Sequence, residues 1–230
     1  MTLTSKYGTL ILLAYTVNTR RKVDHLPKDK TASHIQVMAA VKEEFLEKGF
    51  EAASVRSIAA RVGMSAAGLY RHYANKEAMF EDLVQPLLQE MEEWVCHHKE
   101  KAYARMQQGD EGKQELFGES MIDLIRDVVY PQKEIFQVLL CGASGSQYEN
   151  FMHDYVDAQQ QDMITAFSYM KEHGYAMEEI SHEELHMLLS AYTTAIFEPI
   201  LHNYSEEQMN HCLDTVNRFF MPGWKEIMGF

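Results

Sequence analysis

Cysteine is scarce in this chain of 230 residues: Cys96, Cys141 and Cys212 lie far apart and form no CxxC pair. Such an odd, sparse set of thiols excludes a disulfide-stapled secreted scaffold and fits a reducing compartment. Long apolar runs are missing as well. The nearest approach, residues 9–17, falls far short of the roughly 20 apolar residues that a membrane-spanning helix needs. We therefore expect a cytoplasmic protein that makes no contact with a membrane.

Proline and glycine are also few, with 5 and 12 residues, and sustained alternation of apolar and polar residues is rare. This argues against a strand-rich domain. Apolar residues recur at helical spacing instead, and hydrophobic residues make up 46% of the chain, enough to bury a core. The sequence therefore predicts an all-α protein. The helices we expect, within a few residues at each end, are 37–48, 54–62, 66–73, 76–95, 113–129, 132–141, 148–173, 182–203 and 206–220.

The net charge of −13 is distributed unevenly along the chain. Residues 1–76 hold 12 Lys and Arg against 6 Asp and Glu, whereas residues 77–230 hold 9 against 28. The first part is thus basic by +6 and the second acidic by −19. A basic head on an acidic body indicates a nucleic-acid surface confined to the head, because phosphate repels the rest of the molecule.

Residues 54–77 carry the strongest functional signal. Ser54 and Ser65 each stand where a side chain can cap the helix that follows, and Gly63 permits a tight turn between the two helices. The second helix begins with small residues, so it can lie close to the floor of a groove. The side chains that we expect to point back into the core are Leu69 and Tyr73. Two short helices joined by a tight turn predict a helix-turn-helix.

About fifty residues, from His34 to Leu83, follow one ordered pattern. Its matches are Phe45-x-x-x-Gly49-Phe50, Ser54, Ile58-Ala59, Gly63 and Ser65-x-x-Gly68-Leu69-Tyr70-x-His72-Tyr73-x-x-Lys76-Glu77. This pattern resembles the TetR family of transcriptional regulators. Two positions depart from it: Glu44 stands where the family usually has an apolar residue, and Tyr73 stands where phenylalanine is commoner.

The resemblance implies which residues bind DNA. Lysine and helix N-termini favour phosphate, whereas arginine can hold a guanine edge through two hydrogen bonds. By position, the residues implied to hold the phosphate backbone are Ser54, Tyr70, His72 and Lys76. Those placed to reach base edges are Arg56 and Arg71. The residues at the start of the recognition helix, where the alanines can touch thymine methyl groups, are Ser65, Ala66, Ala67 and Gly68.

The same resemblance implies an organisation in three parts. Residues 1–30 form an arm of unknown role, residues 31–80 a DNA-binding domain, and residues 81–230 a helical regulatory and dimerisation body. In the family, two long helices pair with their copies in a four-helix interface, which we place at about 155–173 and 182–203. The apolar stripes that these helices present are Tyr155, Met163, Phe167, Met170, Leu185, Leu188, Leu189, Tyr192, Ile196 and Ile200.

A small effector is the further partner that the resemblance implies. Flexible methionines and large rings suit a pocket for varied apolar or aromatic ligands, although at helical spacing such residues more often form plain core. The candidates are Met91, Trp94, Phe117, Met121, Phe136, Phe151 and Met152. Pro86 lies inside the helix that starts near Lys76 and is expected to kink it, so that effector binding can move the head.

One competing signal belongs to a zinc hydrolase. Residues 182–186 read His-Glu-Glu-Leu-His, an HExxH motif in which His182 and His186 would bind zinc and Glu183 would act as general base. Glu206 stands where one peptidase family places a third ligand. Ser181 and Glu184, however, form a capping-box pattern that explains the same residues as a helix start.

These observations favour a homodimeric repressor that binds a palindromic double-stranded operator and is released by a small effector. We expect no catalytic residue, cofactor or bound metal. Two alternatives stay open: a DNA-binding scaffold of the same fold that answers to a protein partner, and, less favoured, the zinc hydrolase. Effector, operator, regulated genes and the choice between activation and repression are not encoded in any motif that we can identify.

Overall fold

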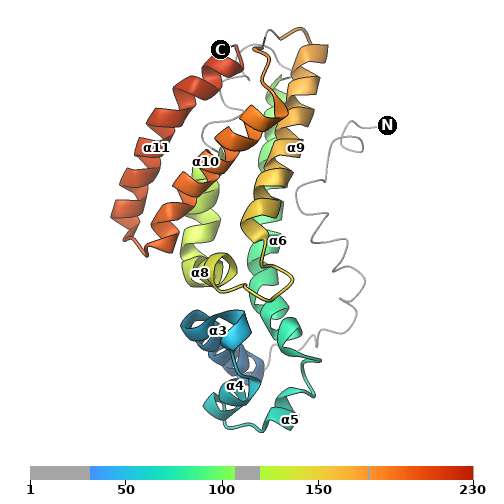
Figure 1. Ribbon diagram of the computed structural model, residues 1–230, viewed down its shortest axis with the longest axis vertical. Coiled ribbons are helices and arrows are strands. Elements are labelled where there is room, and N and C mark those ends of the chain that lie inside the picture. Colours follow the sequence, from blue (N-terminus) through green and yellow to red (C-terminus); the bar gives the residue numbers. More distant parts are fainter. Residues whose placement is uncertain (1–31, 107–119, 176, 230) are drawn as a thin grey trace. The chain divides into compact units, whose positions relative to one another are not determined.

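The computed structural model describes residues 32–106, 120–175 and 177–229, and all regular structure in these ranges is helical (Figure 1). The all-α prediction is therefore confirmed for this part of the chain. The elements are α3 Ala32–Ala52, α4 Val55–Arg61, α5 Ala66–Leu69, α6 Lys76–Met106, α7 Ser120–Leu124, the π-helix η3 Ile125–Val129, the 3-10 helix η4 Tyr130–Gln132, α8 Lys133–Cys141, α9 Phe151–Glu172, α10 His182–Leu201 and α11 Glu206–Ile227. The predicted arm 1–30 lies outside the described residues.

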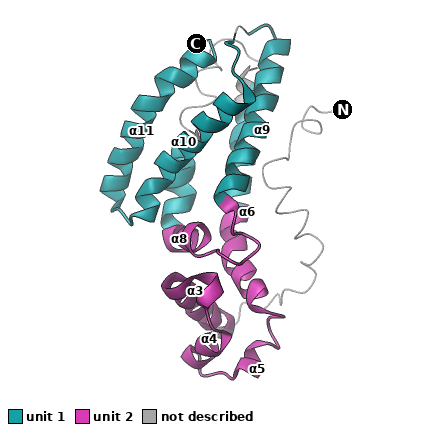
Figure 2. Cartoon of the chain, in the orientation of Figure 1, with its two compact units in different colours: residues 1–18, 90–131, 152–230 teal, residues 19–89, 132–151 magenta. Residues whose placement is uncertain are grey.

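Two compact units divide these helices (Figure 2). Among the described residues, one unit, the head unit, holds those up to Gln89 together with Gln132–Phe151. The other, the body unit, holds Glu90–Pro131 and the residues from Met152 onward. Helix α6 contributes to both units and includes Pro86, beyond which it continues to Met106. The head unit thus also contains α8, a helix that the sequence had assigned to the regulatory body.

The core of the head unit is an aromatic cluster around Phe80. The ring of Phe45 meets it edge-on with centroids 5.1 Å apart, Phe50 does so at 5.4 Å, and Tyr148 lies at 5.7 Å. All four residues are buried. Edge-on aromatic contacts add to the large apolar area that these side chains remove from water. The cluster joins α3, α6 and the segment that follows α8.

Helix α3 is interrupted where the sequence predicts an end, at Gly49. The backbone there has φ 70° and ψ 172°, a conformation that favours glycine. Beside it, the amide of Phe50 donates to the carbonyl of Gly142 over 2.6 Å. A Cβ atom on Gly142 would lie 2.9 Å from the carbonyl oxygen of Val138 and 3.5 Å from the Cα of Gly49. The two glycines therefore permit a backbone approach that larger residues would block.

The body unit packs α9, α10 and α11 around a second core. Its buried members are Val156, Met163, Phe167, Leu185, Leu189, Trp224 and Met228. Serine caps fix where the last two helices begin: Ser181 forms a capping box with Glu184, as predicted, and Ser205 forms one with Gln208. Helix α11 continues to Ile227, beyond the end at 220 that the sequence indicated.

This packing corrects the predicted dimer surface. Every residue of the two apolar stripes on α9 and α10 except Leu188 is buried within the single chain. A buried side chain is not available to a second copy, so these stripes are subunit core. No helix of the described residues is both long enough and apolar enough to cross a membrane.

Candidate nucleic-acid interface

Helices α4 and α5 form a helix-turn-helix. The turn between them passes through Gly63, whose φ is 67°, and the amide of Met64 donates to the carbonyl of Ala59 over 2.9 Å. Ser65 caps α5 as predicted, because its hydroxyl oxygen accepts from the amide of Gly68 at 3.0 Å. Hydrogen bonds continue beyond the end of α5 as far as Tyr73, whose amide donates to Leu69. Leu69 and Tyr73 are buried, as predicted.

Gly68 matters for this cap as well as for a close approach to a groove. A Cβ atom at this position would lie 3.3 Å from the Oγ of Ser65 and 3.6 Å from the Cε of Met64. The first distance is tight, so a side chain here would press on the capping hydroxyl. The small residue thus preserves the start of the recognition helix.

The start of α4 differs from the prediction, because Ser54 makes no side-chain capping bond. Glu44, on α3, supplies the cap instead: its carboxylate accepts from the amide of Ser54 at 3.0 Å and from the hydroxyl of Ser57 at 2.7 Å. Lys48 donates to the same carboxylate at 2.7 Å. The hydroxyl of Ser54 is left on an exposed residue at the edge of the helix-turn-helix.

Glu44 is fully buried, and its charge is held by these partners. Burial by itself raises the pKa of a carboxyl group. Here the hydrogen bonds from Lys48, Ser54 and Ser57 outweigh burial and lower the pKa of Glu44 from 4.5 to about 2. A buried carboxylate with several donors is stable where an unpaired one would not be. The departure from the apolar residue expected at this position therefore has a structural role.

Arg61, at the end of α4, binds the same acidic face of α3. Its guanidinium donates to Glu43 at 2.9 Å, to Glu44 at 3.4 Å and to Glu47 at 2.5 Å. These bonds hold α4 against α3. The sequence analysis assigns Arg61 no role. The spacing of Glu43, Glu44 and Glu47 along one helix is a signal that could have indicated a cationic partner on a neighbouring helix.

Most of the predicted DNA contacts are exposed to solvent. The exposed residues of the set are Ser54, Arg56, Ser65, Ala67, Tyr70, Arg71 and His72, while Ala66 and Gly68 are half-buried. Tyr70 is 50% exposed, which is high for an aromatic side chain. Among the described residues, neither Arg56 nor Arg71 forms an ion pair. Their guanidinium groups are therefore available to an outside ligand.

Lys76 is placed differently from the rest of this set. Its Nζ donates to the carbonyls of Phe50 at 2.5 Å, Glu51 at 3.1 Å and Ala53 at 3.3 Å, and it lies 4.4 Å from the centre of the Phe50 ring. An ammonium group has three donors, and here three carbonyls at the end of α3 accept from it. In this structure Lys76 thus caps α3, and the phosphate contact that the sequence suggested for it stays a prediction.

The second departure from the family pattern, Tyr73, is also satisfied. Its hydroxyl donates to the carboxylate of Asp82 at 2.7 Å and lies 3.2 Å from the Nδ1 of His34. Burial first, and then the charge and hydrogen bond of Asp82, raise the pKa of Tyr73 far above its ordinary value. The hydroxyl thus ties α3 to α6 where phenylalanine would only pack.

Comparison with known proteins agrees with this geometry. The sequence pattern of the family described as "Bacterial regulatory proteins, tetR family" matches residues 37–83, which include the whole helix-turn-helix. This stretch of the chain matches the TetR family. No curated protein sequence matches the chain.

A solved structure of a bacterial repressor shares the fold. NalD of Pseudomonas aeruginosa, described as the secondary repressor of the MexAB-OprM multidrug efflux pump, superimposes with a TM-score of 0.53 at 17% identity, covering 81% of this chain and 94% of NalD. The ketosteroid transcriptional regulator KstR2 of Mycobacterium tuberculosis gives a TM-score of 0.49 at 17% identity, covering 84% of this chain and 97% of KstR2. At this identity the NalD likeness shows the fold alone.

The candidate effector residues are divided between the two units. Phe136 and Phe151 belong to the head unit, where their rings meet edge-on at 6.1 Å. The candidates in the body unit are Met91, Trp94, Met121 and Met152. Phe117 lies outside the described residues. The sulfur of Met121 accepts from the hydroxyl of Tyr155 at 3.6 Å.

The HExxH residues do not form the ligand set of a zinc hydrolase. The capping box at Ser181 uses Glu184, whose pKa is lowered by its hydrogen bonds with Ser181. Among the described residues, the group of possible metal ligands that contains His186 includes neither His182 nor Glu183. The motif thus explains a helix start, and His186 has other partners, on α9.

Replacing Glu44 tests whether its carboxylate orients α4. Glu44→Ala should lower the free energy of unfolding by about 1–3 kcal/mol, because it removes the cap of α4 and the partner of Lys48. Urea unfolding followed by circular dichroism measures this. The folded pKa lies below the ordinary one, so Glu44 stabilises the wild type above about pH 4.5 and loses this effect as the pH falls toward 2. Glu44→Gln should remove that part of the acid sensitivity, and an unchanged acid profile would contradict the assignment.

Replacing Lys76 separates a structural role from a DNA contact. Lys76→Ala should destabilise the protein by about 1–2 kcal/mol, since three carbonyls at the end of α3 lose their donor. Arg71→Ala is the matched control, because Arg71 is exposed and its removal should change stability by less than about 0.5 kcal/mol. If the two variants were equally stable in urea unfolding, Lys76 would not stabilise the end of α3, and its ammonium group would be available to phosphate.

Proposed function

We propose that the chain is a transcriptional repressor that binds a palindromic DNA operator as a homodimer. The observation that carries this proposal is the exposed surface of the helix-turn-helix, where Arg56 and Arg71 have no carboxylate partner among the described residues. Arginine in this position suits a bidentate bond to guanine in the major groove. The exposed Tyr70 and His72 flank Arg71 and suit contacts to phosphate.

The small residues of α5 support the same surface. Ala67 is exposed, and Gly68 carries no side chain that would hold the helix away from a groove. An alanine methyl can contact a thymine methyl but donates no hydrogen bond. Discrimination between base sequences then depends on Arg56 and Arg71, which lie outside α5, while α5 supplies a narrow surface that fits the groove.

The described part of the head is less basic than residues 1–76 as a whole. Of the 12 basic residues before residue 77, 6 lie in residues 1–31, outside the described residues. In residues 32–76 there are 6 basic against 4 acidic residues, and several of the basic ones bind carboxylates or carbonyls. The described head therefore presents a small number of free cationic side chains and not a broad basic patch.

Repression is favoured over activation by the structural likeness to NalD, which is described as a repressor. A regulator that occupies two successive major grooves of a promoter excludes other proteins from it. We propose no catalytic role for the chain, since the residues of the HExxH motif are explained by the start of α10.

The dimer surface that we propose lies on the exposed face shared by α10 and α11. Phe219 is 78% exposed and Met187 is 61% exposed, and large apolar side chains are seldom so exposed unless something covers them. On α11 the apolar or small residues that follow one face are Cys212, Val216, Phe219 and Gly223. A Cβ atom on Gly223 would meet nothing within 4 Å, so a second helix has room to approach. Two heads held by such a symmetric interface would match a palindrome.

A response to a small effector is the finer part of the proposal. In the body unit, Lys99 on α6 donates to Asp162 on α9 over 2.5 Å. Burial lowers the pKa of Lys99 and raises that of Asp162, so both groups are pushed toward their neutral forms. Such a pair adds little stability, because desolvation offsets its attraction. It is therefore a candidate polar anchor for an effector that also contacts the apolar residues nearby.

Helix α6 offers a route for that response. It begins at Lys76, directly after the helix-turn-helix, and reaches Lys99 in the body unit. An effector that binds one position of α6 better than another shifts the heads by its difference in affinity, typically about 1–3 kcal/mol. A protein partner could act on the same helix. Saturable binding of small apolar molecules to the purified protein would favour the effector.

Selection from a random DNA library tests the DNA-binding proposal. The wild type should enrich a palindromic site, whereas Arg71→Ala should lose preference at one base pair per half-site, at a cost of about 1–3 kcal/mol. Glu172→Ala, an exposed control at the end of α9, should select the wild-type site. Failure of the wild type to enrich any palindrome would refute the operator proposal.

Two charge substitutions locate the dimer interface. Phe219→Glu should give a folded monomer with unchanged helical content and weak operator binding. Phe219 is exposed in the single chain, so the charge should disturb the contact between two copies and leave the fold of each copy intact. Leu189→Glu should instead unfold the subunit, because it buries an unpaired charge in the core of the body unit. Sedimentation and circular dichroism distinguish the results. A Phe219→Glu protein that stays dimeric would place the interface elsewhere.

A further inference from the structure

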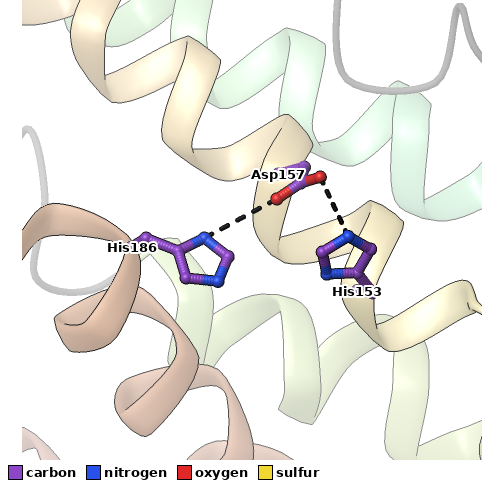
Figure 3. A group of neighbouring side chains, drawn as sticks. All are labelled: His153, Asp157 and His186. Atoms are coloured by element: carbon purple, nitrogen blue, oxygen red, sulfur yellow. Dashed lines mark ion pairs between the residues drawn. The ribbon is translucent and has the colours of Figure 1, made fainter. Parts of the chain in front are cut away.

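Two histidines and an aspartate converge on the surface of the body unit, between α9 and α10 (Figure 3). His153 and Asp157 lie one turn apart on α9, with the His153 Nε2 3.4 Å from a carboxylate oxygen of Asp157. His186 reaches them from α10, with its Nδ1 3.6 Å from the other oxygen. Each residue offers one ligand atom, and these atoms lie within 4.8 Å of one another.

This spacing is close to what a transition metal requires. Zinc binds imidazole nitrogen and carboxylate oxygen at about 2.0–2.2 Å in a tetrahedron, which places its ligand atoms roughly 3.4 Å apart. The 3.4 Å between the His153 Nε2 and Asp157 matches this spacing, and rotations of the side chains would bring the third ligand atom to it. His153 is 67% exposed and Asp157 52% exposed, so those rotations disturb no core packing.

A buried glutamine orients one of the ligands. Gln160 is 1% exposed, and its Nε2 donates to the carbonyl of His182 at 2.6 Å. Its Oε1 is then fixed as the acceptor for the Nδ1 of His186, at 3.1 Å. This hydrogen bond leaves the lone pair of a neutral His186 on Nε2, so Nε2 is the nitrogen that would bind a metal, and the Nδ1 near Asp157 is not. Histidines that bind metals usually have such a partner.

We propose that His153, Asp157 and His186 bind a zinc ion, with water completing the coordination. Two imidazoles and one carboxylate favour zinc over magnesium or calcium, which prefer all-oxygen ligands. The bound ion would fasten the start of α10 to α9 within the body unit. This departs from the metal-free protein expected from the sequence, and it does not depend on the proposed DNA binding.

The site also differs from the HExxH prediction in a way that mutations can separate. Both include His186, but the HExxH set adds His182 and Glu183, whereas the proposed site adds two residues of α9. His182 and Glu183 are exposed at the start of α10, so their side chains can be changed without loss of packing. They are matched controls for the two α9 ligands.

Zinc binding to the untagged full-length protein, stripped with a chelator and dialysed, tests the proposal. Competition with a chromophoric chelator should give one zinc per chain in the wild type. His153→Ala, Asp157→Ala and His186→Ala should each weaken binding by more than about tenfold, while His182→Ala and Glu183→Gln leave it unchanged. Zinc, but not magnesium, should raise the melting temperature of the wild type and of the controls.

Three results would overturn the proposal. One is zinc binding that His153→Ala leaves unchanged, which would place the ion elsewhere. Another is loss of zinc in His182→Ala equal to that in His186→Ala, which would favour the HExxH set. The third is a wild type that binds no zinc, in which case the three residues are only an ion-pair cluster. Because His153 is largely exposed, its variant should fold and keep the test decisive.

Discussion

The buried carboxylate of Glu44 is the interaction on which the arrangement of the head depends. A charge in the core is tolerated only when donors surround it, and here the donors come from the first turn of α4, from Lys48 and from Arg61. Those donors fix the start and the end of α4 against α3. Because α5 follows α4 after a tight turn, the direction of the recognition helix is set by the same carboxylate. The exposed arginines then project from a scaffold that is internally paired.

The head therefore uses its cations for two purposes. Lys76 caps α3 and Arg61 binds the acidic face of that helix, whereas Arg56 and Arg71 face solvent without an ion pair among the described residues. A basic net charge does not distinguish these uses, since it counts a buried cap and a free guanidinium alike. Specific recognition of DNA is better inferred from exposed cationic side chains that form no ion pair within the described residues. The proposed operator contacts therefore depend on Arg56 and Arg71.

In the body unit, apolar stripes serve the core and leave little for partners. The stripe through Leu189 on α10 packs against α9 and α11 inside one chain, and the large apolar residues left exposed include Met187 on α10 and Phe219 on α11. On the polar surface between α9 and α10, His153 and Asp157 of α9 lie close to His186 of α10, which is distant in sequence. Both the proposed interface and the proposed zinc site thus use residues that the core does not need.

The sequence by itself determined the all-helical class, the helix-turn-helix, the match of residues 37–83 to the TetR family pattern and the caps at Ser65 and Ser181, because each depends on residues close together in the chain. The spacing of residues along a helix shows which side chains share a face, but it does not show which other element packs against that face. Hence only the tertiary structure decided that Glu44 caps α4 in place of Ser54, that Lys76 turns to the end of α3, and that Leu189 is core. The meeting of His186 with His153 could not be predicted either, since 33 positions separate them and only the packing of α10 on α9 brings them together.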